Sequence, residues 1–518
     1  MNNYFFIIKE FPMKKKALTL LLALLMVLPM FTACSENAAD NAETTANETE
    51  PTNTTPSADE ETVPVEEEEA EILPDIPALD FEGRDFIFLT SGIGDTNGED
   101  WETFDVWVEE LNGDVINDAV MERNLFINET YNVQINEYKT TGTTLGEIQT
   151  EVKAGSGAFD AAMTHFENGA NLAAGGNLHN LYDMPYINLG QPWWDQRGVE
   201  DMNLMGGVFL ATGDITIIDN DATWVLMFGK QYAEDLQLES LYDLVREDRW
   251  TYDKFYDMMS QAAVDMNGDG TLKWKDDKFG FITSDYSSRA LMYASGEKLV
   301  TQDAQHNLIP LGDINRLSGV VEAAAKIMGD KGITFLTGYE STVPDDIRAV
   351  FEEGRALFYG EVMQCIIRMR ESETEFGLVP WPKYDEMQDG FYNLVHTSAG
   401  RGVCIPVSQT DYEFAGAIIE AFAAKSMYTV TPAYYDVALT YKYMRDTESA
   451  EMLDIILASR IYDLGLIANY GSMAGSIAGV ITNGTGNLAS TWAKSERAFQ
   501  KMMDKSVEKY ADVMNREP

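Results

Sequence analysis

Extended and helical segments alternate along the first part of the folded body, and this alternation limits the fold more than any other feature of the chain. Apolar side chains at helical spacing mark the helices, and period-two alternation marks the strands. The segments are strands at 84–90, 133–138 and 159–163 and helices at 115–131 and 145–154. Strands that alternate with helices form a mostly parallel sheet covered by helices. The sequence therefore predicts an α/β layered domain.

The rest of the chain is richer in helix, and its length allows more than one domain. The predicted helices are 319–328, 345–353, 411–425, 449–460 and 488–509. A chain of 518 residues is long enough for two domain-sized units or one bilobal unit. With 45% hydrophobic and 24% charged residues, the body has the composition of a globular, soluble protein.

The formal net charge of −48 limits the partners that the chain can bind. A strongly acidic surface repels nucleic acids and anionic lipid head groups. We therefore expect no nucleic-acid partner. Part of this charge lies in a polar N-terminal segment, so the charge says little about a ligand.

Residues 13–34 have the layout of a bacterial lipoprotein signal. Three lysines are followed by an apolar core and then by a small residue that precedes Cys34. The apolar core is short for a stable membrane span. We expect residues 1–33 to be a signal peptide, with Met13 as an alternative start, and Cys34 to accept a diacylglycerol. An ordinary secretory signal with a chance cysteine is the alternative.

Residues 34–77 follow as a polar segment rich in Thr, Asn, Ala, Pro and Glu, with almost no aromatic residues. Such a segment buries too little apolar surface to offset its ordering entropy. We predict a disordered acidic tether; an acidic ligand-binding segment is the alternative. Acyl chains on Cys34 would hold the protein to the extracellular face of the cytoplasmic membrane, because each buried CH₂ contributes about 0.8 kcal/mol.

Residues 265–276 match the oxygen-ligand loop that binds calcium in many proteins. In that loop, side-chain and main-chain oxygens surround the ion, and a glycine permits the tight bend. The expected ligands are Asp265, Asn267, Asp269, Thr271 and Asp276. We expect a structural calcium ion here, and a solvated turn that binds no ion is the alternative.

Five segments, taken in order, resemble the extracellular solute-binding proteins of carbohydrate-importing ABC systems, the family that includes maltodextrin- and multiple-sugar-binding lipoproteins. They are GSGAFDAAM at 155–163, AAGGNLHNL at 173–181, the stretch 209–230, FEEGRALF at 351–358 and FGLVPWPK at 376–383. Each motif is weak alone, and their order and spacing carry the resemblance. The chain departs from the family in its tether, its calcium-like loop and the aromatic-rich segment 428–470.

The resemblance implies a periplasmic-binding-protein-like type II fold, with two α/β lobes joined by hinge crossings. It implies a first lobe of 78–212 plus about 359–398, and a second lobe of 213–358 plus about 399–518. It also implies a small polar solute in the cleft, a carbohydrate before any other, and delivery to the permease subunits of an ABC transporter. We expect the protein to be a monomer.

A sugar-binding cleft needs aromatic platforms for C–H faces and planar polar groups for hydroxyls. The candidate ligand-binding residues are His165, Glu167, Asn168, Trp193, Trp194, Asp195, Asp214, Tyr286, Arg289, Tyr359 and Glu361. Each has a structural alternative. Residues 165–168 suit a helix cap, the two tryptophans suit burial beneath a loop, and Asp214 suits a hydrogen bond in a hinge.

The sequence offers no motif for catalysis. It contains no G-x-S-x-G, no H-E-x-x-H and no phosphate-binding glycine loop, and its four histidines lack metal-ligand spacing. We therefore expect a binding protein and not an enzyme. The alternatives are a surface glycan-binding protein without a transporter and a glycan-acting enzyme. Cys365 and Cys404 are expected to be small buried hydrophobic residues, with a bridge between them as the alternative.

Overall fold

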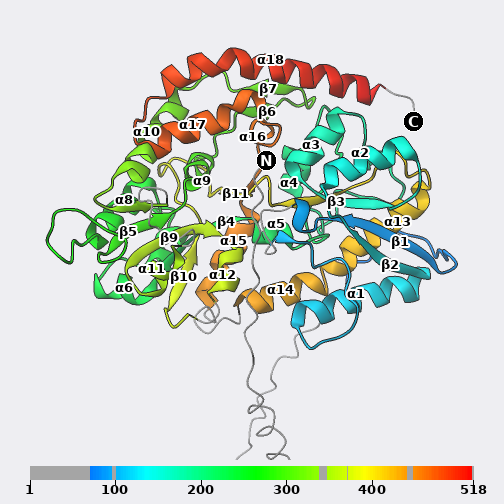
Figure 1. Ribbon diagram of the computed structural model, residues 1–518, viewed down its shortest axis with the longest axis horizontal. Helices are drawn as coiled ribbons and strands as arrows, with labels where there is room; N and C mark the ends of the chain where they lie inside the picture. Colours follow the sequence, from blue (N-terminus) through cyan, green and yellow to red (C-terminus); the bar gives the residue numbers. More distant parts are fainter. Residues whose placement is uncertain (1–70, 96–100, 338–346, 370–371, 440–446, 516–518) are drawn as a thin grey trace, which may run out of the picture. The chain divides into compact units, whose positions relative to one another are not determined.

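The computed structural model describes residues 71–95, 101–337, 347–369, 372–439 and 447–515 (Figure 1). The expected signal peptide, Cys34 and the tether up to residue 70 lie outside the described residues. Residues 71–77 of the expected tether are described, and they contact the body. Glu71 forms an ion pair with Lys425 at 3.0 Å, and the Ile72 amide donates to the Tyr428 hydroxyl at 2.7 Å.

A four-stranded sheet forms the centre of the first lobe, with strand order β12-β3-β1-β2. Its strands are β1 (Arg84–Thr90), β2 (Val133–Lys139), β3 (Ala161–His165) and β12 (Arg401–Cys404). β1 is parallel to β2 and β3, and only β12 runs antiparallel. The predicted order of strands and helices is therefore confirmed in this lobe.

Helices cover both faces of the first sheet. They are α1 (Val115–Tyr131), α2 (Thr144–Ala154), α3 (Phe166–Ala174) and α13 (Tyr412–Ser426). Phe86 and Phe88 point to the face covered by α1 and α13, while Leu89 packs with the apolar side chains of α2 and α3. Because successive strand residues point to opposite faces, a largely apolar strand such as β1 suits a sheet buried on both sides.

A five-stranded sheet forms the centre of the second lobe, with strand order β10-β4-β9-β5-β8. Its strands are β4 (Trp224–Gly229), β5 (Phe279–Thr283), β8 (Thr334–Leu336), β9 (Ala356–Val362) and β10 (Phe376–Val379). β4 is antiparallel to both β9 and β10, and β5 is parallel to β8 and β9. The helices between these strands are α6 (Lys230–Asp235), α7 (Leu241–Arg246), α8 (Tyr252–Ala262), α9 (Ser287–Ala294), α10 (Asn315–Gly329), α11 (Arg348–Glu352) and α12 (Gln364–Arg368).

Three segments connect the lobes. The first crossing contains α5 (Ile218–Asp221) and leads into β4. The second follows β10, contains β11 (Asn393–Leu394) and leads into β12 of the first sheet. The third leaves α13 through α14 (Val430–Leu439), and α15 (Thr447–Ala458) then packs on β10. The first two crossings touch, because Thr223 and Val395 form a β-bridge.

The strand pairing differs from the lobe division expected from the sequence. Residues 359–398 were expected in the first lobe, yet β9 and β10 both pair with β4 in the second sheet. Residues from 399 were expected in the second lobe, yet β12 pairs with β3 and α13 covers the first sheet. The segment FEEGRALF leads into a central strand and not into a crossing, so the second crossing comes later in the chain.

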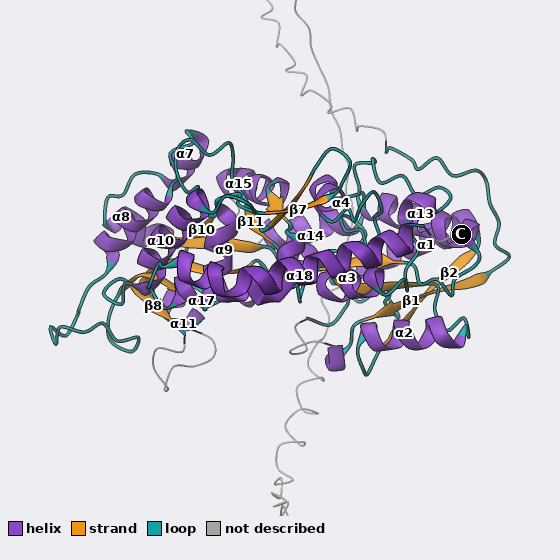
Figure 2. Cartoon of the chain, turned by 90° about the horizontal axis from the view of Figure 1, so that it is seen from above, coloured by secondary structure: helices purple, strands orange, loops and turns teal. Residues whose placement is uncertain are grey.

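The last part of the chain packs on the second lobe and then reaches the first. Its elements are β13 (Arg460–Ile461), α16 (Leu464–Ile467), α17 (Met473–Thr482) and α18 (Leu488–Met514). α18 packs against α10 and α17 of the second lobe and α3 of the first. Figure 2 shows α18 running past α17 towards α3. The Tyr510 hydroxyl donates to the Ala170 carbonyl of α3 at 3.3 Å, so α18 joins the two lobes.

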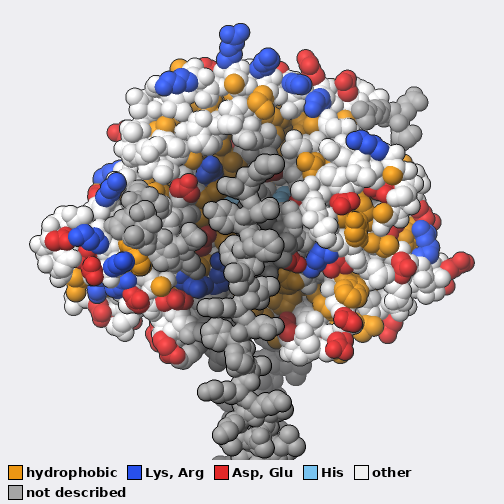
Figure 3. Space-filling model, viewed as in Figure 1, with side chains coloured by type: hydrophobic (Ala, Val, Ile, Leu, Met, Phe, Trp, Pro, Cys, Tyr) orange, Lys and Arg blue, Asp and Glu red, His pale blue; other side chains and the backbone are white. Residues whose placement is uncertain are grey.

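The remaining elements are short. They are β6 (Val300–Gln302), β7 (Leu308–Pro310), α4 (Gln196–Asp201) and the 3-10 turns Ile93–Asp95, Leu181–Asp183 and Tyr470–Ser472. In the described part of the chain, no helix has both the length and the apolar character needed to span a membrane. Cys365 and Cys404 are both buried and form no disulfide with each other. On the visible face, acidic and basic side chains are interspersed, including over α18 (Figure 3).

Candidate functional site

A pocket of about 210 Å³ lies where the first lobe, the second lobe and the second crossing meet. Its lining residues are Trp101, Trp224, Ser284, Tyr286, Glu361, Val362, Gln364, Cys365, Arg368 and His396. Trp101 lies between β1 and α1 of the first lobe, and His396 lies in the second crossing. The others come from one edge of the second sheet and from α12.

The strand directions explain why these side chains meet. β4 begins at Trp224, which pairs with Val362 at the end of β9. β5 runs parallel to β9 and ends beside it, so Tyr286, three residues after β5, lies at the same edge. The His396 amide donates to the Ala222 carbonyl at 2.9 Å, which fixes the second crossing beside the start of β4. The sheet edge and the crossing together build the pocket.

Three nearly parallel rings form the aromatic wall of the pocket. The Tyr286 and His396 rings stack with centroids 4.1 Å apart and an interplanar angle of 13°. The Trp224 and Tyr286 rings lie 5.3 Å apart at 7°. The Arg289 guanidinium lies over the Tyr286 ring, 4.6 Å from its centroid. Flat rings of this kind suit the C–H faces of a sugar.

Polar groups complete the pocket. Glu361, Gln364 and Arg368 supply a carboxylate, an amide and a guanidinium. The Arg368 Nη2 donates to the Gln364 Oε1 at 2.9 Å, which orients both side chains. Planar groups of these types donate to hydroxyls and accept from them.

Two histidines near the pocket are held neutral. Burial, and then the charge of Arg401, lowers the pKa of His165 to about 4. Burial, followed by the charge of Arg289, lowers the pKa of His396 to about 4. A neutral imidazole has one donor and one acceptor, as a hydroxyl partner requires.

Some buried donors near the pocket have no acceptor within the described residues. They are the Trp224 Nε1, the Arg401 Nη1 and, depending on its tautomer, the His165 Nε2. Trp224 is only 2% exposed, so its indole N–H has little access to solvent in this arrangement. A buried donor without a partner costs about 1–3 kcal/mol.

The expected residues 165–168 lie at the end of β3 and the start of α3, in the first lobe. The Glu167 Oε1 accepts from the Thr397 hydroxyl at 2.8 Å, which links α3 to the second crossing. The Asn168 Nδ2 donates to the Thr144 hydroxyl at 3.4 Å within the first lobe. None of these residues lines the pocket, although His165 is close enough to His396 to influence its pKa.

Trp193 and Trp194 lie in the core of the first lobe and not at the pocket. They are 0% and 1% exposed, and both indole N–H groups donate to the Glu420 carboxylate of α13, at 3.2 and 3.0 Å. Burial raises the pKa of Glu420 to about 7. Their position matches the alternative of burial, not the expected contact with a solute.

Asp195 and Asp214 hold the first crossing. Asp195 caps α4 and forms an ion pair with Arg460 at 2.9 Å. Asp214 accepts from the Thr431 hydroxyl at 2.7 Å, and burial raises its pKa to about 6. Its position matches the alternative of a hydrogen bond in the hinge. Gly213 permits a close approach there, since a Cβ at its φ of +134° would lie 2.5 Å from the Trp193 carbonyl oxygen.

Of the expected candidates, Tyr286 and Glu361 line the pocket, and Arg289 lies beside it. Tyr359 is 3% exposed and packs against Phe351 in the core of the second lobe. Trp101, Trp224 and His396 also line the pocket and were not among the candidates expected from the sequence. Trp224 carried one usable signal, because it lies within the stretch 209–230, which resembles the first crossing between the lobes.

The calcium-like loop, residues 265–276, lies between α8 and β5. The Asp265 carboxylate accepts from the amides of Gly268 and Gly270, at 2.7 Å each, and Asp269 forms an ion pair with Lys273. Within the described ranges, no three His, Cys, Asp or Glu side chains are grouped so that they could hold a metal. In this arrangement the loop carboxylates bind their own backbone, so an ion would require Lys273 to move.

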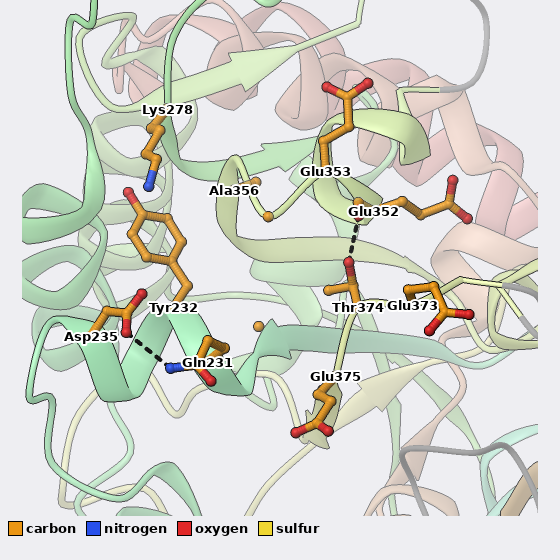
Figure 4. Close-up of a pocket in the computed structure, with 12 residues that line it drawn as sticks. Gln231, Tyr232, Asp235, Lys278, Glu352, Glu353, Ala356, Glu373, Thr374 and Glu375 are labelled. Carbon is orange, nitrogen blue, oxygen red and sulfur yellow. Dashed lines mark hydrogen bonds between the residues drawn. The ribbon is translucent and has the colours of Figure 1, made fainter.

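A second cavity, of about 460 Å³, lies on the second lobe between α6 and α11 (Figure 4). Its rim is acidic, but Figure 4 shows Glu352, Glu353 and Glu375 pointing in different directions. Asp235 accepts from Gln231 at 2.9 Å. These carboxylates do not converge on one point, so the interlobe pocket is the better candidate for a ligand site.

Known structures share this fold. No protein-family model matches the chain, and no curated protein matches its sequence. An ABC substrate-binding protein from Listeria monocytogenes in complex with cycloalternan has a TM-score of 0.50 and 10% identity, covering 84% of this chain and 100% of its own. A sugar transporter from Rhizobium etli in an open conformation has a TM-score of 0.50 and 13% identity, with the same coverage of 84% and 100%.

A cyclo/maltodextrin-binding protein complexed with maltotetraose has a TM-score of 0.51 and 10% identity, and the match covers 83% of this chain and 97% of that chain. Such low identities establish the fold alone. The expected fold is therefore confirmed: two α/β lobes of the periplasmic-binding-protein-like type II fold, shared with carbohydrate-binding components of ABC importers.

Proposed function

We propose that this protein is a solute-binding protein that captures a polar solute, an oligosaccharide before any other, between its two lobes. The observation that carries the proposal is the pocket between the lobes, which combines an aromatic wall with polar groups. The fold supports it, because structures of this fold were solved with cycloalternan and with maltotetraose.

The connection between the lobes suits capture by closure. Three crossings join the lobes, and rotation about such segments closes a cleft around a ligand. Trp101 belongs to the first lobe, whereas Trp224 belongs to the second, so closure would bring both walls onto one solute. A closed shape differs from an open one, and a permease could recognise that difference.

The proposal includes a lipid anchor on Cys34, placement on the extracellular face of the cytoplasmic membrane, and delivery of the solute to an ABC permease. Its support is the sequence of residues 13–34. Replacing Cys34 with Ser should release the protein into the medium and abolish labelling by a fatty acid. Retention of the variant in the membrane fraction would contradict the anchor.

Calorimetry and scattering, described below, also test two other functions. A surface glycan-binding protein without a transporter would bind sugar without lobe closure. A glycan-acting enzyme would need two carboxylates flanking the bond, but Glu361 is the one carboxylate among the described residues that line the pocket.

Titration calorimetry with maltotetraose and with cycloalternan tests the function. We expect saturable heat and no product by chromatography. Trp224→Ala should weaken binding at least tenfold, while Trp107→Ala, which removes a 40% exposed tryptophan of the first lobe, should not. Heat from neither sugar would contradict the sugar-binding proposal, and product formation would favour an enzyme. Small-angle scattering that showed no lobe closure on binding would favour the static surface protein.

A further inference from the structure

The Tyr286 ring is stacked on both other rings of the aromatic wall, Trp224 and His396. Its centroid lies 4.1 Å from that of His396 and 5.3 Å from that of Trp224. A ring stacked at 4.1 Å leaves no room for a second ring on that face of His396. The stacking position that a cyclic solute would use is therefore filled by the protein itself.

The indole N–H of Trp224, whose ring stacks on Tyr286, has no hydrogen-bond partner among the described residues. Trp224 is 2% exposed and its Nε1 has no acceptor among the described residues, although the side chain lines the pocket. An indole N–H can only donate. A solute oxygen that accepted from it would restore a hydrogen bond that the present arrangement lacks, whereas a phenol ring stacked beside it does not.

Tyr286 also lies against the segment that connects the lobes. Its ring stacks on His396 of the second crossing with centroids 4.1 Å apart. The next residue of that crossing, Thr397, donates its hydroxyl to the Glu167 carboxylate of α3 at 2.8 Å. Rotation of the lobes about the crossings would therefore act on the contact between Tyr286 and His396.

We propose that Tyr286 is a gate. It occupies the ring-stacking position beside His396 and Trp224, and a solute binds by displacing it. This inference rests on the proposed function and adds to it the class of group that binds there: a ring of about the size of a phenol, such as a pyranose, with an oxygen that accepts from the Trp224 Nε1. In this role Tyr286 opposes binding, which distinguishes it from an aromatic platform that supports the ligand.

The first experiment needs no ligand. Acrylamide quenching of tryptophan fluorescence is compared between the wild-type protein and Tyr286→Ala, each with and without Trp224→Phe, so that the Trp224 contribution is obtained by difference. We expect Tyr286→Ala to increase quenching of Trp224, and Tyr286→Phe, which keeps the ring, to leave it nearly unchanged. Equal quenching in Tyr286→Ala and the wild type would overturn the gate.

The second experiment measures binding of maltotetraose by calorimetry. Tyr286→Ala should bind maltotetraose about fivefold more tightly than the wild type does. The reason is that the stacking of Tyr286 on His396 no longer has to be broken before the sugar binds. Weaker binding by tenfold or more would overturn the gate, because a platform and not a gate would then have been removed. Tyr286→Leu, which keeps an apolar side chain, repeats the test should the alanine variant fold poorly.

Failure of the two proposals can be told apart. If no sugar binds to any variant while Tyr286→Ala exposes Trp224 to acrylamide, the gate stands and the sugar-binding function is wrong. If maltotetraose binds but Trp224 quenching does not depend on Tyr286, the function stands and the gate is wrong.

Discussion

Beside α5, the guanidinium of Arg460 forms ion pairs with Asp195 and Asp219, both at 2.9 Å, and the Tyr462 hydroxyl donates to Asp195 at 2.8 Å. At the pocket, a short distance along the same crossings, the Trp224 Nε1 has no acceptor within the described chain. We call Asp195, Asp219, Arg460 and Tyr462 the hinge network. Both regions bury polar groups. In the hinge network the two carboxylates pair with Arg460, whose Nε lacks an acceptor in the described chain, whereas at the pocket the single N–H of the Trp224 indole lacks one.

The two regions differ in what their buried polar groups do. In the hinge network these groups pair with one another and stabilise the fold, whereas at the pocket the Trp224 N–H is available to a ligand. Asp195 lies in the first lobe, Asp219 in the first crossing, and Arg460 follows the third crossing, so the hinge network connects segments far apart in sequence. A buried charge is tolerated when it is paired and hydrogen bonded. A donor left without a partner beside a pocket is instead available to a ligand. Substitutions at matched positions test this comparison.

The largest expected effect follows removal of the central cation of the hinge network. Arg460→Met leaves the Asp195 and Asp219 carboxylates buried without a counter-charge, and should lower the free energy of unfolding by about 3–5 kcal/mol. Urea denaturation measures this change. Arg289→Met, the same chemical change beside the pocket, should cost less than about 1 kcal/mol. Equal losses of unfolding free energy in the two variants would show that the hinge network stabilises the fold no more than the pocket does.

The next effect is a dependence on pH at the first crossing. Burial raises the pKa of Asp221 to about 7, against an ordinary 3.8. Between these values the folded state keeps a proton that the unfolded state releases. The stability that this residue contributes is therefore fully present below pH 4 and is lost as the pH rises through about 7.

The matched variant for this prediction is Asp221→Asn, which keeps the shape of the side chain and removes the titration. Between pH 4 and pH 7 the wild type should lose about 4 kcal/mol of unfolding free energy relative to the variant. Thermal unfolding of both proteins across that range measures the difference. Parallel stability curves would show that Asp221 does not titrate in this range.

The sequence predicted the fold better than the site, and particular elements show why. Helix 115–131 and strand 84–90 were predicted with the bounds that the structure has, because their periodicity is local. The pocket wall is not local. Trp224, Tyr286 and His396 are neighbours only because β4, β5 and the second crossing meet at one sheet edge, and no spacing in the sequence encodes that meeting.

The same limit explains the tryptophan pair. Two adjacent tryptophans next to a carboxylate, as at Trp193 and Trp194, give the same sequence pattern whether their rings face a cleft or the core. Their burial is decided by Glu420, which accepts from both indoles and lies more than two hundred residues later in the chain. The predicted lobe boundary was wrong for a related reason. An apolar segment that precedes a crossing has the same sequence pattern as an apolar central strand.

A smaller effect compares single hydroxyls. Tyr462→Phe removes a buried hydroxyl that donates to Asp195 and should lower the unfolding free energy by about 1.5 kcal/mol. Tyr286→Phe removes the hydroxyl of a partly exposed side chain at the pocket and should cost about 0.5 kcal/mol or less, because such a hydroxyl exchanges one hydrogen bond for another with water. Urea denaturation of both variants tests the difference, and a larger loss for Tyr286→Phe would reverse the comparison.

The smallest expected effect concerns loop 265–276, which extends the comparison to an exposed region of the second lobe. We propose a structural calcium ion there. Carboxylates of the loop already accept from loop amides, and Lys273 forms an ion pair with Asp269. Calcium would have to replace some of these contacts, so its net contribution to the stability of the protein is small. At calcium ten times above its dissociation constant, binding to the folded state alone adds about 1.4 kcal/mol.

Calcium should therefore raise the melting temperature of the wild type by a few degrees, and a chelator should reverse the rise. Asp265→Asn removes one expected ligand and should abolish the response, while Asp243→Asn, an exposed acidic residue outside the loop, should keep it. Identical melting curves with calcium and with chelator would show that the carboxylates of this loop serve its backbone turn alone. In that case the loop carboxylates are satisfied by their own amides, as the Asp195 and Asp219 carboxylates are by Arg460, and the unpartnered Trp224 N–H beside the pocket remains the contrast.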